Sequence, residues 1–194
     1  QMEHELVSRV VELLHIDAAL LEQALQEKDL YTVRRRKKPG KDAAGRPRFR
    51  VLHVPPPSVK EVQRAIHEYL LDLAHGWFQN SINFAWPPAM HGFLPRRSQL
   101  TAARDHIGAK ALFTLDFQDA FPSVKRPRVA KALERHVKIS PHEADFIARL
   151  ATYRGRLRQG SPSSPLLFNL VVFDLLKEIE RFVGERGYRI TIYA

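Results

Sequence analysis

Cysteine is absent from the 194 residues, which excludes a disulfide framework and a thiolate metal site. Long apolar runs are missing too. The best candidate, 166–176, is interrupted by Asn169 and Asp174, so it indicates a helix of a folded domain rather than a membrane span. The N-terminal residues are acidic and amphipathic, without the basic-then-apolar order of a secretory signal. We therefore expect an intracellular, cytoplasmic protein.

Acidic residues are fewer than basic ones: 21 Asp and Glu against 31 Lys and Arg, for a net charge of +10. Between positions 31 and 50, nine basic residues stand against one acid, Asp42. The nine are Arg34, Arg35, Arg36, Lys37, Lys38, Lys41, Arg46, Arg48 and Arg50. Such a patch attracts polyanions, nucleic acid above all. The alternative is a solvated, flexible loop, because Gly40 and Gly45 would break a helix there.

Hydrophobic residues make up 44% of the chain, enough for a real core in one domain or two small lobes. Apolar periodicity and capping residues predict helices at 2–28 (one or two), 58–73, 98–107, 128–137, 141–153 and 164–183. Short apolar or alternating runs predict strands at 49–54, 111–115 and 188–193. Since these elements lack a regular βαβ rhythm, the predicted fold class is α+β.

Asp116 directly follows the apolar run 111–115, which predicts a buried strand that ends at this carboxylate. A buried carboxylate is costly unless it is compensated, and a divalent cation compensates it well. The alternative is an ordinary strand-end aspartate that caps the next turn. Asp119 would point to the opposite face of a continuing strand. Phe121, just before Pro122, either packs in the core or lines a pocket.

Small polar residues at 159–165 lead into the helix predicted from Ser164 and Pro165. A helix N-terminus carries partial positive charge and free N–H groups, so this loop is suited to a phosphate or a nucleic-acid backbone. The alternative is a plain capped helix start, which every helix needs.

These signals occur together in one order along the chain. They lie at 91–98, 103–106, 115–124 and 159–165, followed by Asn169 and the closing pair Tyr193-Ala194. Through these segments the chain resembles the retron branch of bacterial reverse transcriptases, over 31–194. Tyr193-Ala194 resembles the first half of the family's Tyr-Ala-Asp-Asp signature.

The resemblance implies the fold of a right-hand polymerase. We expect fingers and part of a palm, with a ferredoxin-like palm sheet flanked by helices and with the thumb absent. The expected division is an N-terminal helical extension at 1–30, fingers at 31–56 and 126–158, and partial palm at 57–125 and 159–194.

The resemblance also implies roles for single residues. Asp116 matches the first metal-binding carboxylate, with the carbonyl of Phe117 as an auxiliary ligand. Phe121 matches the ring beneath the incoming sugar, where bulk collides with a 2′-hydroxyl and so selects deoxynucleotides. Gln159 and Gly160 match the loop near the incoming nucleotide and the template.

Arg50 matches the arginine of the fingers that holds the triphosphate, with Lys37 or Lys38 as its lysine partner. The further residues expected on nucleic acid are Arg34, Arg35, Arg36, Arg48, His91, Arg96, Arg97, Ser98 and Arg158. Arg96 stands where the family usually has Gly, and Arg158 where it usually has Pro. Both departures add charge beside the expected nucleic-acid path.

The function implied is RNA-directed DNA polymerisation, in which two Mg²⁺ ions assist nucleotidyl transfer. Asp116 supplies one carboxylate, and the other two are expected after Ala194. We therefore expect residues 1–194 to bind nucleic acid without polymerising. The expected partners are an RNA template and primer, a structured noncoding RNA among the candidates, and dNTPs. Exposed palm surface is expected to favour self-association.

Two other functions remain open from the sequence. One is a reverse-transcriptase-like module that binds RNA and has lost catalysis, which would not need Asp116. The other is a relative in phage defence that makes DNA without a template.

Overall fold

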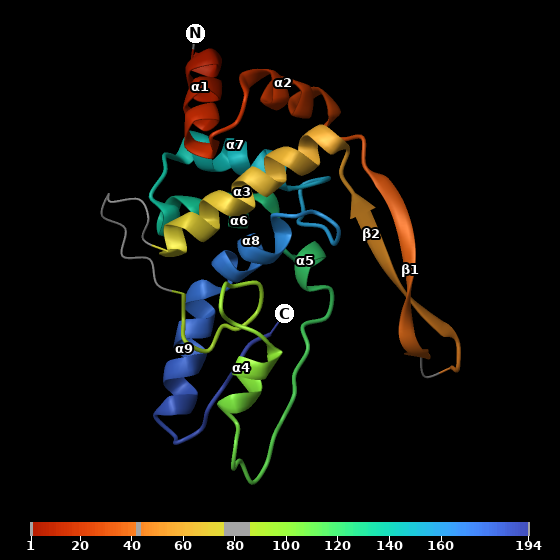
Figure 1. The fold of residues 1–194 in the computed structure, drawn as a ribbon, viewed down its shortest axis with the longest axis vertical. Coiled ribbons are helices and arrows are strands. Elements are labelled where there is room, and N and C mark those ends of the chain that lie inside the picture. Colours follow the sequence, from red (N-terminus) through yellow and green to blue (C-terminus); the bar gives the residue numbers. More distant parts are fainter. Residues whose placement is uncertain (1, 42–43, 76–85, 194) are drawn as a thin grey trace.

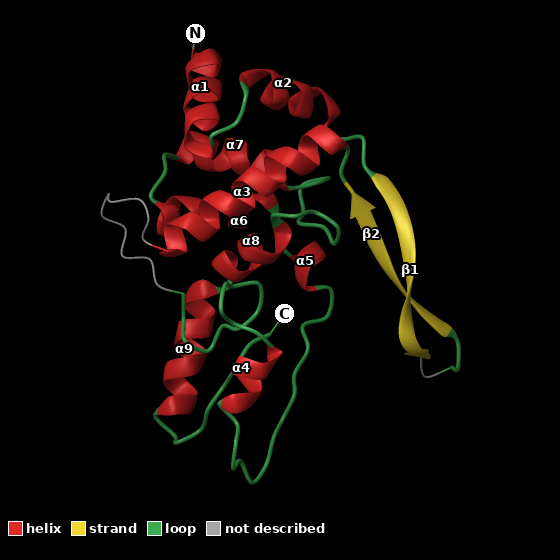
Figure 2. Ribbon diagram, viewed as in Figure 1, coloured by secondary structure: helices red, strands yellow, loops and turns green. Residues whose placement is uncertain are grey.

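The computed structural model describes residues 2–41, 44–75 and 86–193, and helices predominate in it (Figure 1; Figure 2). The helices are α1 (Met2–Leu14), α2 (Ala18–Glu27), α3 (Pro57–His75), α4 (Gln99–Arg104), α5 (Ala120–Ser123), α6 (Arg126–Ala132) with its π-helical continuation η1 (Leu133–Val137), α7 (Pro141–Ala151), α8 (Ser164–Val171) and α9 (Phe173–Gly184). Two strands, β1 (Thr32–Lys41) and β2 (Pro47–Val54), form an antiparallel hairpin. The predicted α+β class is confirmed. Among the described helices, none has the length and apolar character needed to cross a membrane.

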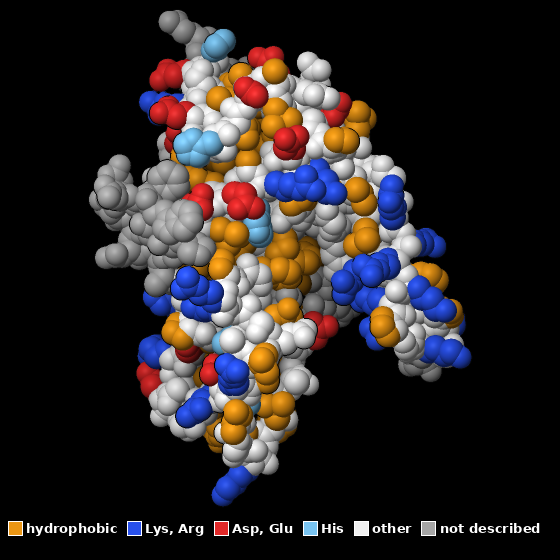
Figure 3. All heavy atoms as spheres, in the orientation of Figure 1, with side chains coloured by type: hydrophobic (Ala, Val, Ile, Leu, Met, Phe, Trp, Pro, Cys, Tyr) orange, Lys and Arg blue, Asp and Glu red, His pale blue; other side chains and the backbone are white. Residues whose placement is uncertain are grey.

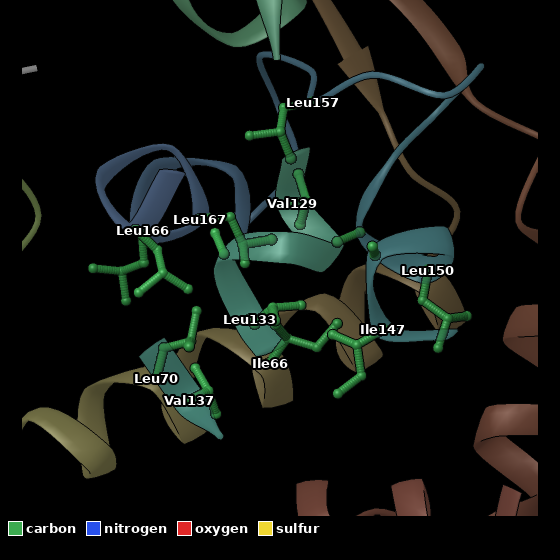
Figure 4. Close-up of a cluster of buried hydrophobic side chains, with 14 of the residues drawn as sticks. Ile66, Leu70, Val129, Leu133, Val137, Ile147, Leu150, Leu157, Leu166 and Leu167 are labelled. Atoms are coloured by element: carbon green, nitrogen blue, oxygen red, sulfur yellow. The ribbon is translucent and has the colours of Figure 1, made fainter. Parts of the chain in front are cut away.

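The hydrophobic core lies where α3, α6, η1, α7 and α8 meet (Figure 4). Its fully buried side chains include Ile66, Leu70, Leu133, Ile147, Leu150, Leu157, Leu166 and Leu167. Each such side chain stabilises the fold by about 1.5–3 kcal/mol relative to exposure. α1 and α2 pack on α3, so the N-terminal helices belong to this same core.

Local sequence signals account for where α7 begins. The backbone N–H of Glu143 donates to the Ser140 hydroxyl at 3.3 Å, and the Ser140 N–H donates to the Glu143 carboxylate at 2.8 Å. Pro141 occupies the first turn, where a missing N–H does no harm. The single helix predicted over 164–183 is instead two, because the chain turns at Val172 between α8 and α9.

The basic segment forms most of the hairpin, which projects from the helical body (Figure 1). The segment therefore consists of strands rather than a loop, and most of its side chains are exposed. Arg and Lys have little preference for strands, but pairing of β1 with β2 satisfies their backbone groups. The pairing is irregular between Lys37 and Lys41, near the turn.

The strand predicted at 111–115 is not formed, and its side chains are not buried. Phe113 is 91% exposed and Leu115 is 98% exposed. A strand needs a neighbour for its backbone groups, and the described residues offer none to this segment. The expectation of a buried strand ending at Asp116 is therefore wrong.

The strand predicted at 188–193 is reduced to one isolated parallel bridge between Met90 and Ile192. The β1–β2 hairpin is the one sheet of the described residues, so they do not contain the palm sheet that the resemblance implies. The bridge still has a consequence. Ile192 donates to the carbonyl of Ala89 at 2.7 Å and accepts from the N–H of His91 at 2.7 Å, which ties the end of the chain to the 91–98 segment.

Candidate functional site

α8 is the element on which the separate sequence motifs meet. Its residue Asn169 is buried, and the side-chain Nδ2 donates a hydrogen bond to the carbonyl of Gly92 at 3.0 Å. A net contribution of about 1 kcal/mol is typical of such a bond, and leaving one buried partner unpaired costs more. Asn169 therefore fixes the 91–98 segment against α8.

Phe168 connects α8 to the segment around Asp116. Phe117 and Phe121 each approach the Phe168 ring edge-on, with ring centroids 6.3 and 5.7 Å away. Asp119 lies between them with a left-handed φ of +50° and leads into α5. Phe121 is half-buried, so it packs on the core and still presents part of its surface to solvent.

Asp116 itself is exposed, and it makes no hydrogen bond or ion pair with the residues that the structure describes. Within those residues, no three His, Asp or Glu side chains are grouped so that they would hold a metal ion. The donor set present therefore does not fit a complete two-metal site. Asp116 is the carboxylate to which the resemblance assigns metal binding.

The loop that contains Gln159 and Gly160 lies against β2. The N–H of His53 donates to the carbonyl of Gln159 at 2.7 Å. Gly160 has φ +108°, and a Cβ at this position would lie 2.7 Å from the carbonyl oxygen of His53. Glycine is therefore required, because the backbone at position 160 packs directly on the backbone of His53 and leaves no room for a side chain. This contact joins the loop to the hairpin that carries Arg50.

A stack of aromatic rings supports the same junction. Tyr153 is buried and stacks on Tyr31 with ring centroids 4.3 Å apart, and the His53 ring lies 5.8 Å from Tyr153. Buried Gln63 donates from Nε2 to the Tyr31 hydroxyl at 2.8 Å and to the carbonyl of Leu150 at 2.9 Å. Burial raises the pKa of Tyr31. The stack positions the base of the hairpin over α3 and α7.

Sequence reasoning missed this stack. Tyr31 and Tyr153 come from distant parts of the chain, and no local pattern connects them. The one available signal is Gln63, a polar residue beside the apolar stripe of α3 that the structure buries fully.

The hairpin has two chemically different faces. Arg36 lies directly opposite Arg50, so both point to one face, and alternation adds Arg34 and Arg48 to it. Lys37 lies opposite Phe49, on the other face. Two lysines were expected as partners of Arg50. Lys37 lies on the opposite face of the hairpin from Arg50, and half-buried Lys38 lies where the strand pairing becomes irregular.

The arginine face holds like charges close together. Lysine and arginine side chains gather over the hairpin in the space-filling view (Figure 3). Like charges directly across an antiparallel pair, such as Arg36 and Arg50, are destabilising. A bound polyanion would relieve that repulsion.

Comparison with known proteins decides the family. A family model described as reverse transcriptase (RNA-dependent DNA polymerase) matches residues 36–194. The chain belongs to the reverse transcriptase family. The retron Ec86 reverse transcriptase of Escherichia coli is 29% identical over 151 residues, which cover 76% of this chain and 47% of the relative. The retron Mx65 and Mx162 reverse transcriptases of Myxococcus xanthus are each 29% identical and cover 75% of this chain but 36% and 31% of their own lengths.

The resemblance to retron reverse transcriptases is thereby confirmed. The chain spans about half of the length of the first of these relatives and about a third of the other two.

In this member of the reverse transcriptase family, the 91–98 segment is organised mainly by contacts within the chain. The Arg97 guanidinium donates to the carbonyls of Pro87 at 2.6 Å and Met90 at 2.5 Å. Ser98 caps α4 by accepting from the N–H of Thr101. Arg97 and Ser98 thus hold the loop in shape.

His91 and Arg96 occupy different positions in that segment. The buried His91 ring lies 2.8 Å from the hydroxyl of Thr101 and 3.3 Å from the Asp105 carboxylate. Arg96 is exposed and has a left-handed φ of +59°. Glycine adopts that conformation freely, whereas arginine is strained in it.

Arg158, the second departure from the family pattern, is folded onto its neighbours. Its Nε donates to the carbonyl of Tyr153 at 3.2 Å, and its guanidinium lies 5.7 Å from the centre of the Tyr153 ring. Burial, followed by the charge of Arg156, lowers the pKa of Arg158. The side chain is half-buried, so it supports the aromatic stack as much as it faces any ligand.

A cavity of about 670 Å³ opens between α1 and the start of α7. Its lining includes Leu6, Arg9, Phe146 and Arg149, and none of the predicted site residues. The cavity and the family motifs are therefore separate features.

Proposed function

We propose that this chain forms the nucleotide- and template-binding part of an RNA-directed DNA polymerase, which extends a primer with dNTPs on an RNA template. The observation that carries this proposal is the convergence of the family motifs on α8. Asn169 holds Gly92, Phe168 meets Phe117 and Phe121, and the loop before α8 docks on the hairpin. The names of the retron relatives support the same activity.

The arginine face of the hairpin would bind the triphosphate and the nucleic-acid backbone. Arg50 offers a planar guanidinium that matches phosphate oxygens in bidentate fashion, and Arg36 stands directly across from it. Because the Gln159-Gly160 loop contacts β2, the hairpin and the loop would enclose the nucleotide from two sides. Phe121, braced by Phe168, would contact the sugar from beneath.

Magnesium belongs to this proposal through Asp116. When bound, two such ions make the primer 3′-oxygen more nucleophilic and stabilise the departing pyrophosphate. Asp116 would contribute one carboxylate, and the others would come from sequence beyond Ala194. For residues 1–194 alone we therefore expect nucleic-acid binding without primer extension.

The structure favours one alternative enough to keep it. A module that binds RNA without catalysis has no need of Asp116, which is exposed and makes no hydrogen bond or ion pair with the described residues. That alternative predicts no acidic pair after Ala194. It also predicts that RNA binding does not depend on Asp116.

The first test combines the parent gene with a binding assay. The proposal predicts Asp-Asp immediately after Ala194, salt-dependent binding of an RNA–DNA hybrid by residues 1–194, and no primer extension by them. Other residues after Ala194, together with intact RNA binding, would favour the non-catalytic module. Robust primer extension by residues 1–194 would contradict the expected inactivity. Extension by the continued protein with the template RNA left out would favour a template-independent enzyme.

A further inference from the structure

Basic residues are concentrated in a second segment that the family motifs do not include. Positions 125–158 carry ten Lys and Arg against three acids. Together with the hairpin segment 31–50, they hold nineteen of the chain's 31 basic residues and four of its 21 acidic ones. The rest of the chain is therefore acidic on balance. Such segregation of charge marks a surface for polyanions.

The turn after α7 presents an arginine in an unfavourable conformation. Tyr153 and Arg156 exchange backbone hydrogen bonds of 3.0 and 3.2 Å across a two-residue turn. The two central residues are both left-handed, Arg154 with φ +50° and Gly155 with φ +68°. Asn, Asp or Gly is favoured at such a position, whereas arginine is strained there. Arg154 is exposed, so packing does not explain why an arginine occupies this strained backbone position, and a role for its guanidinium does.

This turn is continuous with the start of α6. Lys125 and Arg156 form an antiparallel bridge, and the N–H of Arg126 donates to the carbonyl of Gly155 at 2.9 Å. It is also continuous with the hairpin, since Gln159 accepts from β2. In Figure 1 the loop between α7 and α8 lies beside the base of the hairpin. The hairpin, the turn and α6 therefore form one connected surface.

Three cations of this surface are already engaged within the chain. Arg126 pairs with Asp145 at 3.4 Å, and the Arg156 guanidinium donates to the carbonyl of Pro122 at 2.8 Å. Arg158 donates to Tyr153. On the turn and on the stretch from Lys125 through α6, the exposed cations without a carboxylate partner among the described residues are Lys125, Arg128, Lys131 and Arg154. The Arg154 guanidinium lies 5.3 Å from the centre of the Tyr153 ring, which supports it from below.

The chemistry of this surface fits nucleic acid better than protein. Between 118 and 174, all within the described ranges, no large hydrophobic side chain is exposed. Protein interfaces depend on buried aromatic and aliphatic anchors, and among the described residues the turn and α6 expose none, whereas the hairpin exposes Val33, Phe49 and Val51. Cations spaced along a helix turn and a tight loop suit a chain of phosphates, which needs no apolar contact.

We propose that Lys125, Arg128, Lys131 and Arg154 form a second phosphate-binding surface, which takes the backbone of the nucleic acid where it continues past the hairpin. The assignment rests on the proposed function in one respect: the bound strand is part of the template–primer. This surface extends the contact between protein and nucleic-acid backbone beyond the family motifs. Because it adds phosphate contacts, the affinity depends more steeply on salt.

Arg154→Gly separates binding from folding. It removes one cation and relieves the left-handed strain, so the thermal unfolding temperature stays the same or rises. Affinity for a fluorescein-labelled RNA–DNA hybrid, measured by anisotropy over a KCl series, falls, and the slope of log K against log salt decreases by about one. The triple variant K125A/R128A/K131A decreases that slope by about three. Lys177→Ala is the charge control, because it removes an exposed cation on α9, outside the 31–50 and 125–158 segments.

Each outcome of this experiment decides a different point. If Arg154→Gly and the triple variant bind as tightly as the unmodified chain, the second surface is overturned. In that case, loss of binding in R36A/R50A leaves the proposed function intact. Equal weakening by Lys177→Ala also overturns it, since net charge alone then explains the effect. Unchanged binding by R36A/R50A removes the nucleic-acid role of the hairpin, and with it the proposed function.

Discussion

Replacing Gly160 by alanine tests whether the Gln159-Gly160 loop is docked on β2. The new Cβ would lie 2.7 Å from the carbonyl oxygen of His53, a separation that Cβ atoms essentially never show. Gly160 also has φ +108°, which alanine rarely adopts. Backbone strain of this kind costs about 1–3 kcal/mol, and losing the bond between His53 and Gln159 costs about 1 kcal/mol more. We expect a destabilisation of about 2–4 kcal/mol, which lowers Tm by about 4–16 °C for a chain of this size.

Two assays measure this effect. Thermal unfolding by circular dichroism gives the loss of stability, and spin-label distances give the orientation of the hairpin. Because the chain has no cysteine, labels at P39C on the hairpin and E178C on α9 need no background substitutions. The distance distribution is expected to broaden in Gly160→Ala, since the hairpin loses its contact with the loop.

Gly187→Ala is the matched control for that prediction. Gly187 has φ +75°, but a Cβ there would meet nothing within 4 Å, so the variant carries conformational strain alone, about 1 kcal/mol. If Gly160→Ala unfolds at the same temperature as Gly187→Ala and leaves the distance distribution unchanged, the loop does not dock on β2 and the reasoning fails.

Three further predictions follow from single contacts. Tyr153→Leu removes the ring at the centre of the aromatic stack and is expected to lower the free energy of unfolding in urea by about 1–2 kcal/mol. Tyr153→Phe retains the ring and is expected to retain that free energy. Burial and the charge of Arg158 lower the pKa of His53. The contribution of neutral His53 to the free energy of unfolding is therefore complete above about pH 6.5 and is lost as the pH falls through the lowered pKa. His53→Gln should flatten that decline. Leu115→Ser should reduce self-association in sedimentation velocity without lowering Tm, because Leu115 is exposed; unchanged association would count against a role for this segment.

Local signals in the sequence predicted much of the helical framework. Ser140 followed by Pro141, with Glu143 three residues after the cap, determines the start of α7 because the capping interactions are local. The apolar stripe on 58–73 likewise predicted α3. The order of the family motifs identified the family before any tertiary contact was known.

Tertiary contacts were beyond that reasoning. The apolar run before Asp116 has the composition of a buried strand, but burial depends on a neighbouring strand, and the described residues provide none. The stack of Tyr31 on Tyr153 joins residues far apart in the chain, so no period or spacing reveals it. The strained Arg154 follows from the backbone of one turn rather than from its composition.

Primer extension tests the central claim most directly. The protein continued through the residues that follow Ala194 in its gene would be compared with its Asp116→Asn variant, on an RNA template with a DNA primer, dNTPs and Mg²⁺. The account predicts template-dependent extension by the unmodified protein and a loss of at least about a hundredfold in Asp116→Asn, with hybrid binding retained. Equal extension by the two proteins, or binding without any extension by either, would contradict it.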